Sequence, residues 1–213
     1  MILSSTLIQQ KAFSLIELLV VVGIIVIVSA SILANNSQFG GKVLLQNFAY
    51  DLALSVRQAQ VYGISVKKFT TNTGVSTFTS GYGMHFDVSN KLAGQSYILF
   101  ADALTINGLY DQNELVDNNL ISRGFYITQL CTTPISTNVE TCIDSNSVSS
   151  PSNPLTLDIL FKRPEPDALI SFRGVSCVLT PLNCATNARI VVISPRGDLM
   201  SIKVQANGQI TVQ

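Results

Sequence analysis

Hydrophobic residues form one long run near the N-terminus and several short, separated runs further along the chain. Seventeen of the 22 residues at positions 13–34 are apolar, and Glu17 is the charged exception. As a helix with about 1.5 Å rise per residue, this segment would span roughly 33 Å, close to the thickness of a membrane's hydrocarbon layer. Its β-branched residues would suit a strand in water, but in lipid the backbone must satisfy its own hydrogen bonds. We therefore expect a transmembrane helix over residues 13–34.

A second helical pattern follows a polar joint. Residues 35–41 (NNSQFGG) are mostly polar and end in two glycines, which predicts a melted or kinked joint. Over residues 42–66, apolar positions recur at steps of three and four, as in an amphipathic helix. This apolar stripe consists of Leu44, Leu45, Phe48, Leu52, Val56, Ala59 and Gly63. We expect the second helix to continue the first and to pack its stripe against a sheet.

Beyond residue 67 the pattern changes to short β-type runs separated by turn residues. The candidate strands are residues 83–88, 97–101, 125–130, 155–161, 168–172, 189–194, 200–204 and 209–212. The last three are joined by the turn sequences PRGD (195–198) and ANG (206–208), which predicts an antiparallel meander at the C-terminus. The order predicts an α+β fold, in which a long N-terminal helix packs on an antiparallel β-sheet head. Residues 144–154 (DSNSVSSPSNP) predict a surface loop.

Composition separates the membrane segment from the rest of the chain. The 213 residues are 47% hydrophobic and 12% charged, with 13 basic and 13 acidic side chains. This composition excludes a disordered chain, and the zero net charge argues against a general nucleic-acid binder. Residues 35–213 alone are 43% apolar, which is ordinary for a soluble fold. We therefore expect a membrane segment followed by a globular head.

Two charged residues near the N-terminus bear on topology and function. Lys11 is the one basic residue before the apolar run, and a basic flank stays cytoplasmic. We therefore expect a single-pass protein with its N-terminus in the cytoplasm and its head outside. A carboxylate in hydrocarbon is costly unless it is paired, so Glu17 needs a partner. A secretory signal peptide cleaved near residues 29–31 is an alternative, although this run is longer than a signal core and contains an acid.

The run KAFSLIELLV (residues 11–20) resembles the cleavage and methylation site of type IV prepilins and type II secretion pseudopilins. The resemblance implies that prepilin peptidase cuts between Ala12 and Phe13 and removes residues 1–12 as a leader. It also implies that Phe13, the new N-terminal residue, is N-methylated. Family members normally have glycine before the cut, where this chain has Ala12. Alanine has the smallest side chain after glycine, so we expect processing. Glu17 would be the fifth mature residue.

Cleavage would create the partner that Glu17 needs. The new α-amine of Phe13 is positive and lies at the edge of an apolar helix, so it can neutralise Glu17 of a neighbouring subunit when helices stack. Removing one member of such a buried pair costs roughly 3–5 kcal/mol. We therefore predict that Glu17 sets the register of assembly and is not a catalyst. A carboxylate merely tolerated near the membrane interface is the alternative.

The head is also similar to the pseudopilin and minor-pilin group with antiparallel heads. The similar segments are GYGMHF (81–86), YILFAD (97–102), FKRPEP (161–166) and the terminal hairpin. The resemblance implies an inner-membrane precursor that becomes a structural subunit of a type IV pilus or a type II secretion filament, periplasmic or extracellular after assembly. Its partners would be other pilin or pseudopilin subunits and prepilin peptidase.

Two other functions stay open. The first is a single-pass anchored protein that never polymerises. The second is a minor pilin that binds DNA, although no nucleic acid is expected from the net charge. Such a protein would need clustered cations, and the candidates are Arg189, Arg196 and Lys203 near the terminal hairpin.

The four cysteines predict disulfides rather than zinc. They lie at Cys131, Cys142, Cys177 and Cys184, without a CxxC pair, and the one histidine, His85, falls in a candidate strand. A head outside the cytoplasm would allow disulfides, and four cysteines allow three pairings. We favour Cys131 with Cys142 and Cys177 with Cys184, because each pair closes a short polar loop. Free buried thiols are the alternative.

Residues 102–114 (DALTINGLYDQNE) contain oxygen ligands of the kind that calcium prefers. The candidate ligands are Asp102, Asn107, Asp111 and Glu114. The alternating positions between the first two are Leu104 and Ile106, which cannot ligate through their side chains, so a polar hairpin loop is the alternative. No other cofactor is expected. With one histidine, no nucleophile motif and no phosphate-binding glycine loop, the sequence predicts no enzyme.

Overall fold

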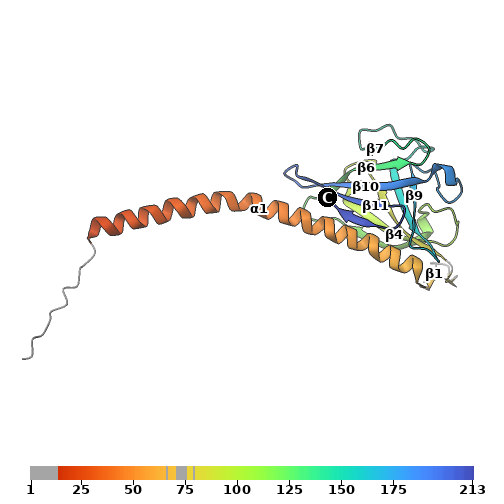
Figure 1. Cartoon of the computed structure of the whole chain (residues 1–213), viewed down its shortest axis with the longest axis horizontal. Helices are drawn as coiled ribbons and strands as arrows, with labels where there is room; N and C mark the ends of the chain where they lie inside the picture. Colours follow the sequence, from red (N-terminus) through yellow and green to blue (C-terminus); the bar gives the residue numbers. More distant parts are fainter. Residues whose placement is uncertain (1–13, 66, 71–75, 79) are drawn as a thin grey trace, which may run out of the picture. The chain divides into compact units, whose positions relative to one another are not determined.

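The computed structural model describes residues 14–65, 67–70, 76–78 and 80–213 (Figure 1), with side chains for all of these except 34–40 and 76. The chain divides into two compact units, Met1–Gly41 and Lys42–Gln213. We call the second one the globular unit.

Helix α1 (Leu15–Ile64) contributes residues to both units. Its first part contains residues 15–34 of the predicted transmembrane segment, and its second part contains residues 42–64 of the predicted amphipathic helix. Residues 35–41, for which the sequence predicts a melted or kinked joint, are helical and therefore not melted, and the boundary between the units follows directly after them. The physical reason is that this segment contains no proline, and each glycine costs a helix only about 1 kcal/mol.

The second part of α1 packs an apolar stripe into the globular unit. Its buried residues, each at most 1% exposed, are Leu45, Ala49, Leu52, Val56 and Ala59. Their spacing of three and four places them on one helix face, as the sequence predicts. Leu44, which the sequence assigns to the same stripe, is 39% exposed. It precedes Leu45 by one residue and is therefore rotated by about 100° from that face.

The last turn of α1 comes very close to strand β8 (Thr156–Phe161) at Gly63. A Cβ atom added to Gly63 would overlap the main-chain carbonyl of Phe161. Because that carbonyl belongs to a paired central strand, it cannot move aside without breaking the ladder. Gly63 therefore allows an approach between helix and sheet that no larger residue permits.

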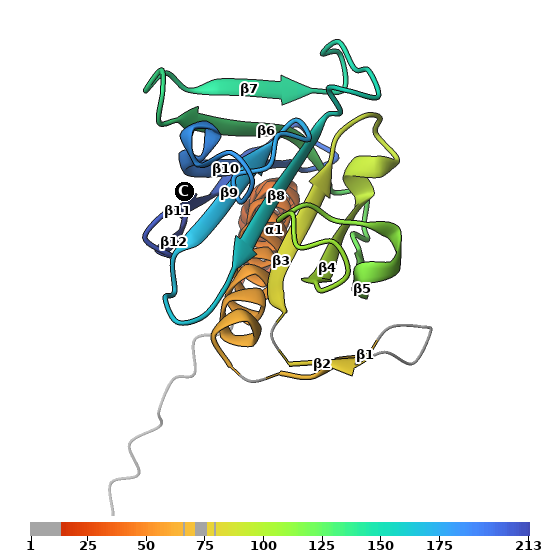
Figure 2. The same cartoon turned by 90° about the vertical axis from the view of Figure 1, so that its right-hand side faces the viewer.

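Within the described residues, ten strands form two five-stranded antiparallel sheets (Figure 2). Sheet 1, in the order β5-β4-β3-β8-β9, contains β3 (Gly81–Asp87), β4 (Ser96–Asp102), β5 (Leu115–Leu120), β8 and β9 (Ala168–Phe172). Sheet 2, in the order β12-β11-β10-β6-β7, contains β6 (Tyr126–Pro134), β7 (Thr141–Asp144), β10 (Ala185–Ile193), β11 (Leu199–Gln205) and β12 (Ile210–Val212). The remaining elements are the pair β1 (Phe69–Thr70) and β2 (Ser76–Thr77) and the 3-10 turns η1 (Ala93–Gln95), η2 (Gln112–Glu114) and η3 (Pro181–Asn183).

The predicted α+β class is confirmed, and so is the antiparallel meander, which is β10-β11-β12. All eight candidate strands are present, with ends that differ by up to four residues. Four strands were not predicted: β1, β2, β5 and β7. The expectation of one sheet was incomplete, because β6 pairs with β10 and not with the strands before it.

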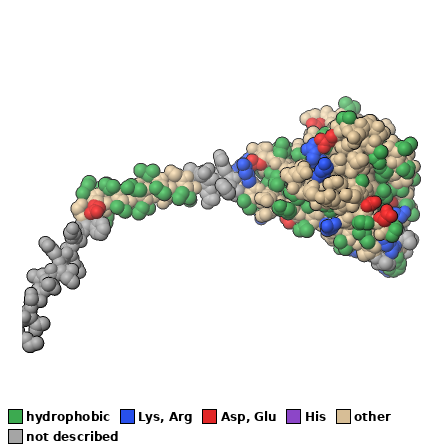
Figure 3. All heavy atoms as spheres, in the orientation of Figure 1, with side chains coloured by type: hydrophobic (Ala, Val, Ile, Leu, Met, Phe, Trp, Pro, Cys, Tyr) green, Lys and Arg blue, Asp and Glu red, His purple; other side chains and the backbone are tan. Residues whose placement is uncertain are grey.

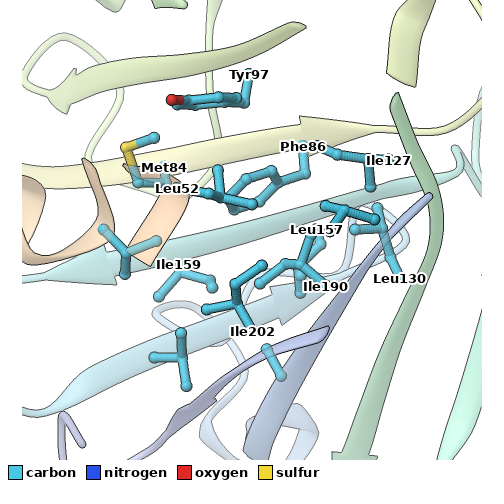
Figure 4. Close-up of a cluster of buried hydrophobic side chains, with 14 of the residues drawn as sticks. Leu52, Met84, Phe86, Tyr97, Ile127, Leu130, Leu157, Ile159, Ile190 and Ile202 are labelled. Carbon is cyan, nitrogen blue, oxygen red and sulfur yellow. The ribbon is translucent and has the colours of Figure 1, made fainter. Parts of the chain in front are cut away.

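The core of the globular unit lies between α1 and both sheets. Leu52 of α1, Phe86 of β3 and Ile190 of β10 belong to one cluster, and all three are 0% exposed (Figure 4). Strands of both sheets lie beside the helix in Figure 2. A single core therefore holds the helix and both sheets together. The strands that lead into the loops are anchored in this core.

Candidate assembly segment and loop sites

Helix α1 begins at a serine cap. The Glu17 N–H donates to Ser14 Oγ at 3.3 Å, and the Ser14 carbonyl oxygen accepts hydrogen bonds from the Glu17 and Leu18 N–H groups at 3.0 and 3.2 Å. Ser14 thereby satisfies main-chain donors that have no partner within the first turn. This role was not predicted, although Ser-x-x-Glu before an apolar run is a sequence signal for a capped helix start.

Glu17 lies in the first turn of α1, and its side chain is exposed in the isolated chain. A negative charge is favourable there, because the N-terminal end of a helix carries a partial positive charge. In water the helix end is sufficient to accommodate the carboxylate, whereas in hydrocarbon a cation is also required. The predicted processing residues Ala12 and Phe13 lie outside the described residues.

The first part of α1 exposes a continuous apolar surface. Leu15–Leu33 has a mean hydropathy of 2.8 over 19 residues, and none of it is buried. Figure 3 shows hydrophobic side chains along this part of the helix. With about 1.5 Å rise per residue it would cover ~28 Å, so by length and composition it can cross a membrane. Such a surface is stable in lipid or against other apolar helices.

The cysteines form two disulfides in the sequential pairing. Cys131 is bonded to Cys142, and Cys177 to Cys184. Cys131 and Cys142 face each other on β6 and β7, so the first disulfide joins two strands of a hairpin. Among the described residues, one group of three has the proximity of metal ligands, and it consists of this disulfide and Glu140. Because its sulfurs are oxidised, this group cannot supply thiolate ligands.

The four candidate calcium ligands separate into two pairs. Asn107 and Asp111 are half-buried, and Asn107 Nδ2 donates to Asp111 Oδ2 at 3.3 Å. Asn107 Oδ1 accepts the Leu109 N–H at 2.8 Å, so the loop uses this amide to hold its own turn. Asp102 and Glu114 lie at the two ends of the loop and are 1% and 0% exposed. Of the four, these two keep a buried oxygen without a hydrogen-bond partner.

The predicted strand residue His85 forms an ion pair within sheet 1. His85 and Asp158 face each other on β3 and β8, with Nδ1 and Oδ1 2.7 Å apart. Asp158 is 2% exposed, and its Oδ1 also accepts the Tyr110 N–H at 3.2 Å. Burial opposes a charge on His85, but the charge and hydrogen bond of Asp158 and the charge of Asp87 together raise the pKa of His85 above its ordinary value.

This ion pair predicts a pH dependence of stability. A histidine whose pKa is raised on folding stabilises the fold fully below its unfolded pKa of about 6.5, and the contribution is lost as pH rises through the folded value. We therefore expect the unfolding free energy of the wild type to fall as pH rises above about 6.5. Denaturant titrations at a series of pH values measure it. In the variant His85→Gln, the unfolding free energy should no longer show this fall with rising pH. The same fall in the variant as in the wild type would contradict the conclusion that His85 causes it.

The three cations proposed for DNA binding lie along the terminal hairpin. Arg189 of β10 faces Lys203 of β11, and Arg196 lies in the turn between these strands. Arg189 donates from Nε and Nη2 to the two carboxylate oxygens of Glu140, at 2.9 and 2.8 Å. The hydrogen bond from Arg189 lowers the pKa of Glu140, so the pair stays ionised. Glu140 therefore compensates the charge of Arg189, which weakens the positive surface that DNA would need.

Residues 7–33 match the family model of the prokaryotic N-terminal methylation motif. The match includes Ala12, Phe13, Ser14 and Glu17, and it ends at Leu33, where the span able to cross a membrane also ends. No curated protein and no solved structure matches the chain. The chain thus combines a methylation motif, an apolar N-terminal helix and a β-rich globular unit. This combination is typical of type IV pilins and pseudopilins, and in these features the chain is pilin-like.

Proposed function

We propose that the protein is a structural subunit, a minor pilin or pseudopilin, of a type IV pilus or a type II secretion filament. The observation that carries this proposal is the methylation motif over residues 7–33, because it coincides with a capped helix whose apolar side chains are exposed. In this proposal residues 1–12 are a leader and residues 13–34 the transmembrane and assembly helix. Residues 35–66 link this helix to a β-rich head, residues 67–213.

The start of α1 supports processing between Ala12 and Phe13. Hydrolysis of that peptide bond would leave a free α-amine on Phe13, which is then methylated. Ser14 would become the second residue of the mature chain, so the amine would lie directly beside the helix cap. The new positive charge would then be one residue away from Ser14, which caps the helix.

Assembly would follow from the charges and the apolar surface at this helix end. The positive amine and the positive helix end would both lie in an apolar environment, where an unpaired charge is strongly unfavourable. Glu17 of a neighbouring subunit supplies the opposite charge. Side chains from Leu15 to Leu33 would then pack against equivalent helices, and the ion pair would fix how far one helix is shifted along the next.

The two disulfides support a head outside the cytoplasm. Disulfides persist in oxidising compartments, which agrees with a cytoplasmic N-terminus flanked by Lys11. In this arrangement the precursor lies in the inner membrane, and its partners are prepilin peptidase and other pilin or pseudopilin subunits. The proposed role is structural and needs no catalytic centre, so we infer that the protein is not an enzyme.

The mature N-terminus tests the proposal against an anchored protein that never polymerises. We expect mass spectrometry of the chain isolated from its native membrane to find an N-terminal peptide that begins at methylated Phe13. An anchored protein would keep residues 1–12, and a cleaved signal peptide would leave an N-terminus after residue 29, 30 or 31. The variant Ala12→Leu is the control, because a bulky residue at the cut should leave the leader attached. A wild-type chain that begins at Met1 would contradict the proposal.

A further inference from the structure

A cavity of about 300 Å³ lies in the globular unit, where β9 at the edge of sheet 1 runs beside β10 of sheet 2 (Figure 2). Its wall includes the end of β6, the end of β9 with the turn after it, and the start of β10. The apolar part of the lining consists of Pro134, Phe172, Val175 and Ala185. Small-molecule pockets have volumes of about 300–1,000 Å³, so this cavity has room for a small ligand with an apolar part.

Two disulfides and a main-chain hydrogen bond hold this wall in place. Cys131 directly precedes the cavity residue Thr132, and Cys184 directly precedes Ala185. The Ile135 N–H donates to the Cys184 carbonyl oxygen at 3.0 Å, which joins the segment after β6 to the segment before β10. The wall is therefore cross-linked, so binding does not have to order it.

Of the described residues that line the cavity, Arg173 alone is charged. Its half-buried side chain is held by two hydrogen bonds, one from Nε to Asn153 Oδ1 and one from Nη2 to the Val148 carbonyl oxygen at 2.7 Å. Both acceptors are neutral, and over the described part of the chain no carboxylate pairs with Arg173 and Nη1 has no partner. An oriented guanidinium with unused N–H groups and no counter-charge is suited to bind an anion.

The backbone at Arg173 is unusual for an arginine. Arg173 and Gly174 are the central residues of the turn from Phe172 to Val175, and their φ angles are 54° and 73°. The Val175 N–H closes this turn by donating to the Phe172 carbonyl oxygen at 3.0 Å. Turns with positive φ at both central residues favour asparagine or glycine at the first of them, because a longer side chain is strained there. Strained residues cluster at ligand-binding sites, which supports a role for the Arg173 side chain.

Thr132 adds a second unused hydrogen-bonding group to the wall. The residue is 0% exposed, and its hydroxyl oxygen is buried without a hydrogen-bond partner. Such a hydroxyl is unfavourable until a polar atom satisfies it. Among its described residues, the cavity therefore offers hydrogen-bond donors and a positive charge but no negative charge. An ionised carboxylate matches this lining, because it only accepts hydrogen bonds.

We propose that this cavity binds a small monocarboxylate, with the carboxylate on Arg173 and a short alkyl group against the apolar lining. One carboxylate is favoured over two, because the lining has one cation. An inorganic anion would leave the apolar side chains unused. An α-amino acid would bring an ammonium group, for which the described lining has no carboxylate.

Equilibrium dialysis of the full chain in detergent micelles against radiolabelled 3-methylbutanoate tests the proposal, with protein-free micelles as the blank. For a ligand of this size we expect a dissociation constant of about 1 mM. At about tenfold excess over that value, the acid should raise the melting temperature by about 3–6 °C above that in sodium chloride of the same ionic strength. Circular dichroism of the β-rich unit measures this shift.

Two comparison ligands separate the carboxylate from the alkyl group. The neutral 3-methylbutanamide keeps the alkyl group and loses the charge, whereas acetate keeps the carboxylate and loses most of the alkyl group. We expect each to bind at least about tenfold more weakly than 3-methylbutanoate. These comparisons use the wild-type chain and therefore do not depend on how a variant folds.

Variants of two arginines assign the charge to its residue. Arg173→Gln removes the cation, and we expect it to weaken binding of 3-methylbutanoate at least about tenfold. Arg123→Gln is the matched control, because Arg123 also has a positive φ, 61°, but does not line this cavity. It should bind the acid like the wild type. Melting curves of both variants without ligand show whether each is folded.

The same chemical group occurs in free short-chain acids and at the C-terminus of a peptide that ends in a small apolar residue. N-acetylglycylvaline carries the carboxylate and a branched alkyl group on a peptide. Tighter binding of this peptide than of 3-methylbutanoate would identify a chain end as the source of the ligand. Tighter binding of the acid would identify a free metabolite, and either result supports a carboxylate site.

Three results would overturn the proposal. The first is a wild-type chain that does not bind 3-methylbutanoate at about 10 mM, ten times the expected dissociation constant. The second is equal affinity for the acid and its amide, because the cation would then not take part. The third is wild-type affinity in a folded Arg173→Gln, which would place the ligand elsewhere. None of these results bears on processing or assembly, so this test is independent of the proposed function.

Discussion

In the variant Glu17→Ala, we expect the chain to reach the membrane and to be processed like the wild type but to be lost from filaments. The reason is that the α-amine of Phe13 would be buried against neighbouring helices without its counter-charge. Such an uncompensated charge costs roughly 3–5 kcal/mol, which corresponds to a loss of about 100-fold or more in the assembly equilibrium. Immunoblots of the membrane fraction and of sheared, pelleted filaments measure the two populations separately.

A second variant separates the effect on assembly of losing the ion pair from the effect of losing the helix cap. Ser14→Ala removes the hydroxyl that accepts the Glu17 N–H but keeps the carboxylate. Loss of a cap costs about 0.5–2 kcal/mol, so this variant should assemble far better than Glu17→Ala. Glu17→Gln, which keeps the shape and removes the charge, should fail like Glu17→Ala. Wild-type filament levels in Glu17→Ala would contradict a role for Glu17 in assembly.

Truncating Leu52 should cause the largest loss of stability in the globular unit among the helix residues. Leu52 is 0% exposed and lies in the cluster that α1 shares with both sheets (Figure 4). Leu52→Ala removes a fully buried side chain from this cluster and leaves a cavity, which costs about 2–5 kcal/mol. Urea titration, followed by the circular dichroism of the β-rich unit, measures this loss as a lower midpoint.

Leu54 provides the matched control two residues further along the same helix. Its side chain is 65% exposed, so Leu54→Ala should change the unfolding free energy by no more than about 0.5 kcal/mol. Both variants replace leucine by alanine in the same helix and have the same helix propensity. Equal losses of unfolding free energy in Leu52→Ala and Leu54→Ala would show that the buried stripe of α1 does not stabilise the core.

The helix and most strands could be predicted because their signals are local. Spacings of three and four residues predict the buried face that contains Leu45, Leu52 and Val56, and apolar runs between turns predict the strands of the terminal meander. Strand β5 was missed because it reads LVDNNL and most of its side chains are exposed. The division into two sheets could not be predicted, because the pairing of β6 with β10 joins residues that are far apart in the sequence.

For the candidate sites, too, only features that depend on neighbouring residues in the sequence could be predicted. The methylation motif and Glu17 are read from ten consecutive residues, and the matched motif over residues 7–33 contains them. The loop after Asp102 was recognised by its composition, but composition cannot show which oxygens the backbone occupies. Asn107 and Asp111 bond to each other, whereas Asp102 and Glu114 each keep a free oxygen, and these outcomes depend on how the chain turns.

The single helix α1 has a mechanical consequence. Tension on residues 15–33 of an assembled subunit would reach the globular unit through the main chain of α1. In the globular unit that helix is held by Leu45, Leu52 and Val56 inside the core, not by a surface loop. A force along the helix axis would act on these contacts at the same time and in shear, so they would not break one after another. Resistance to rupture would then depend on the rate at which the whole core opens.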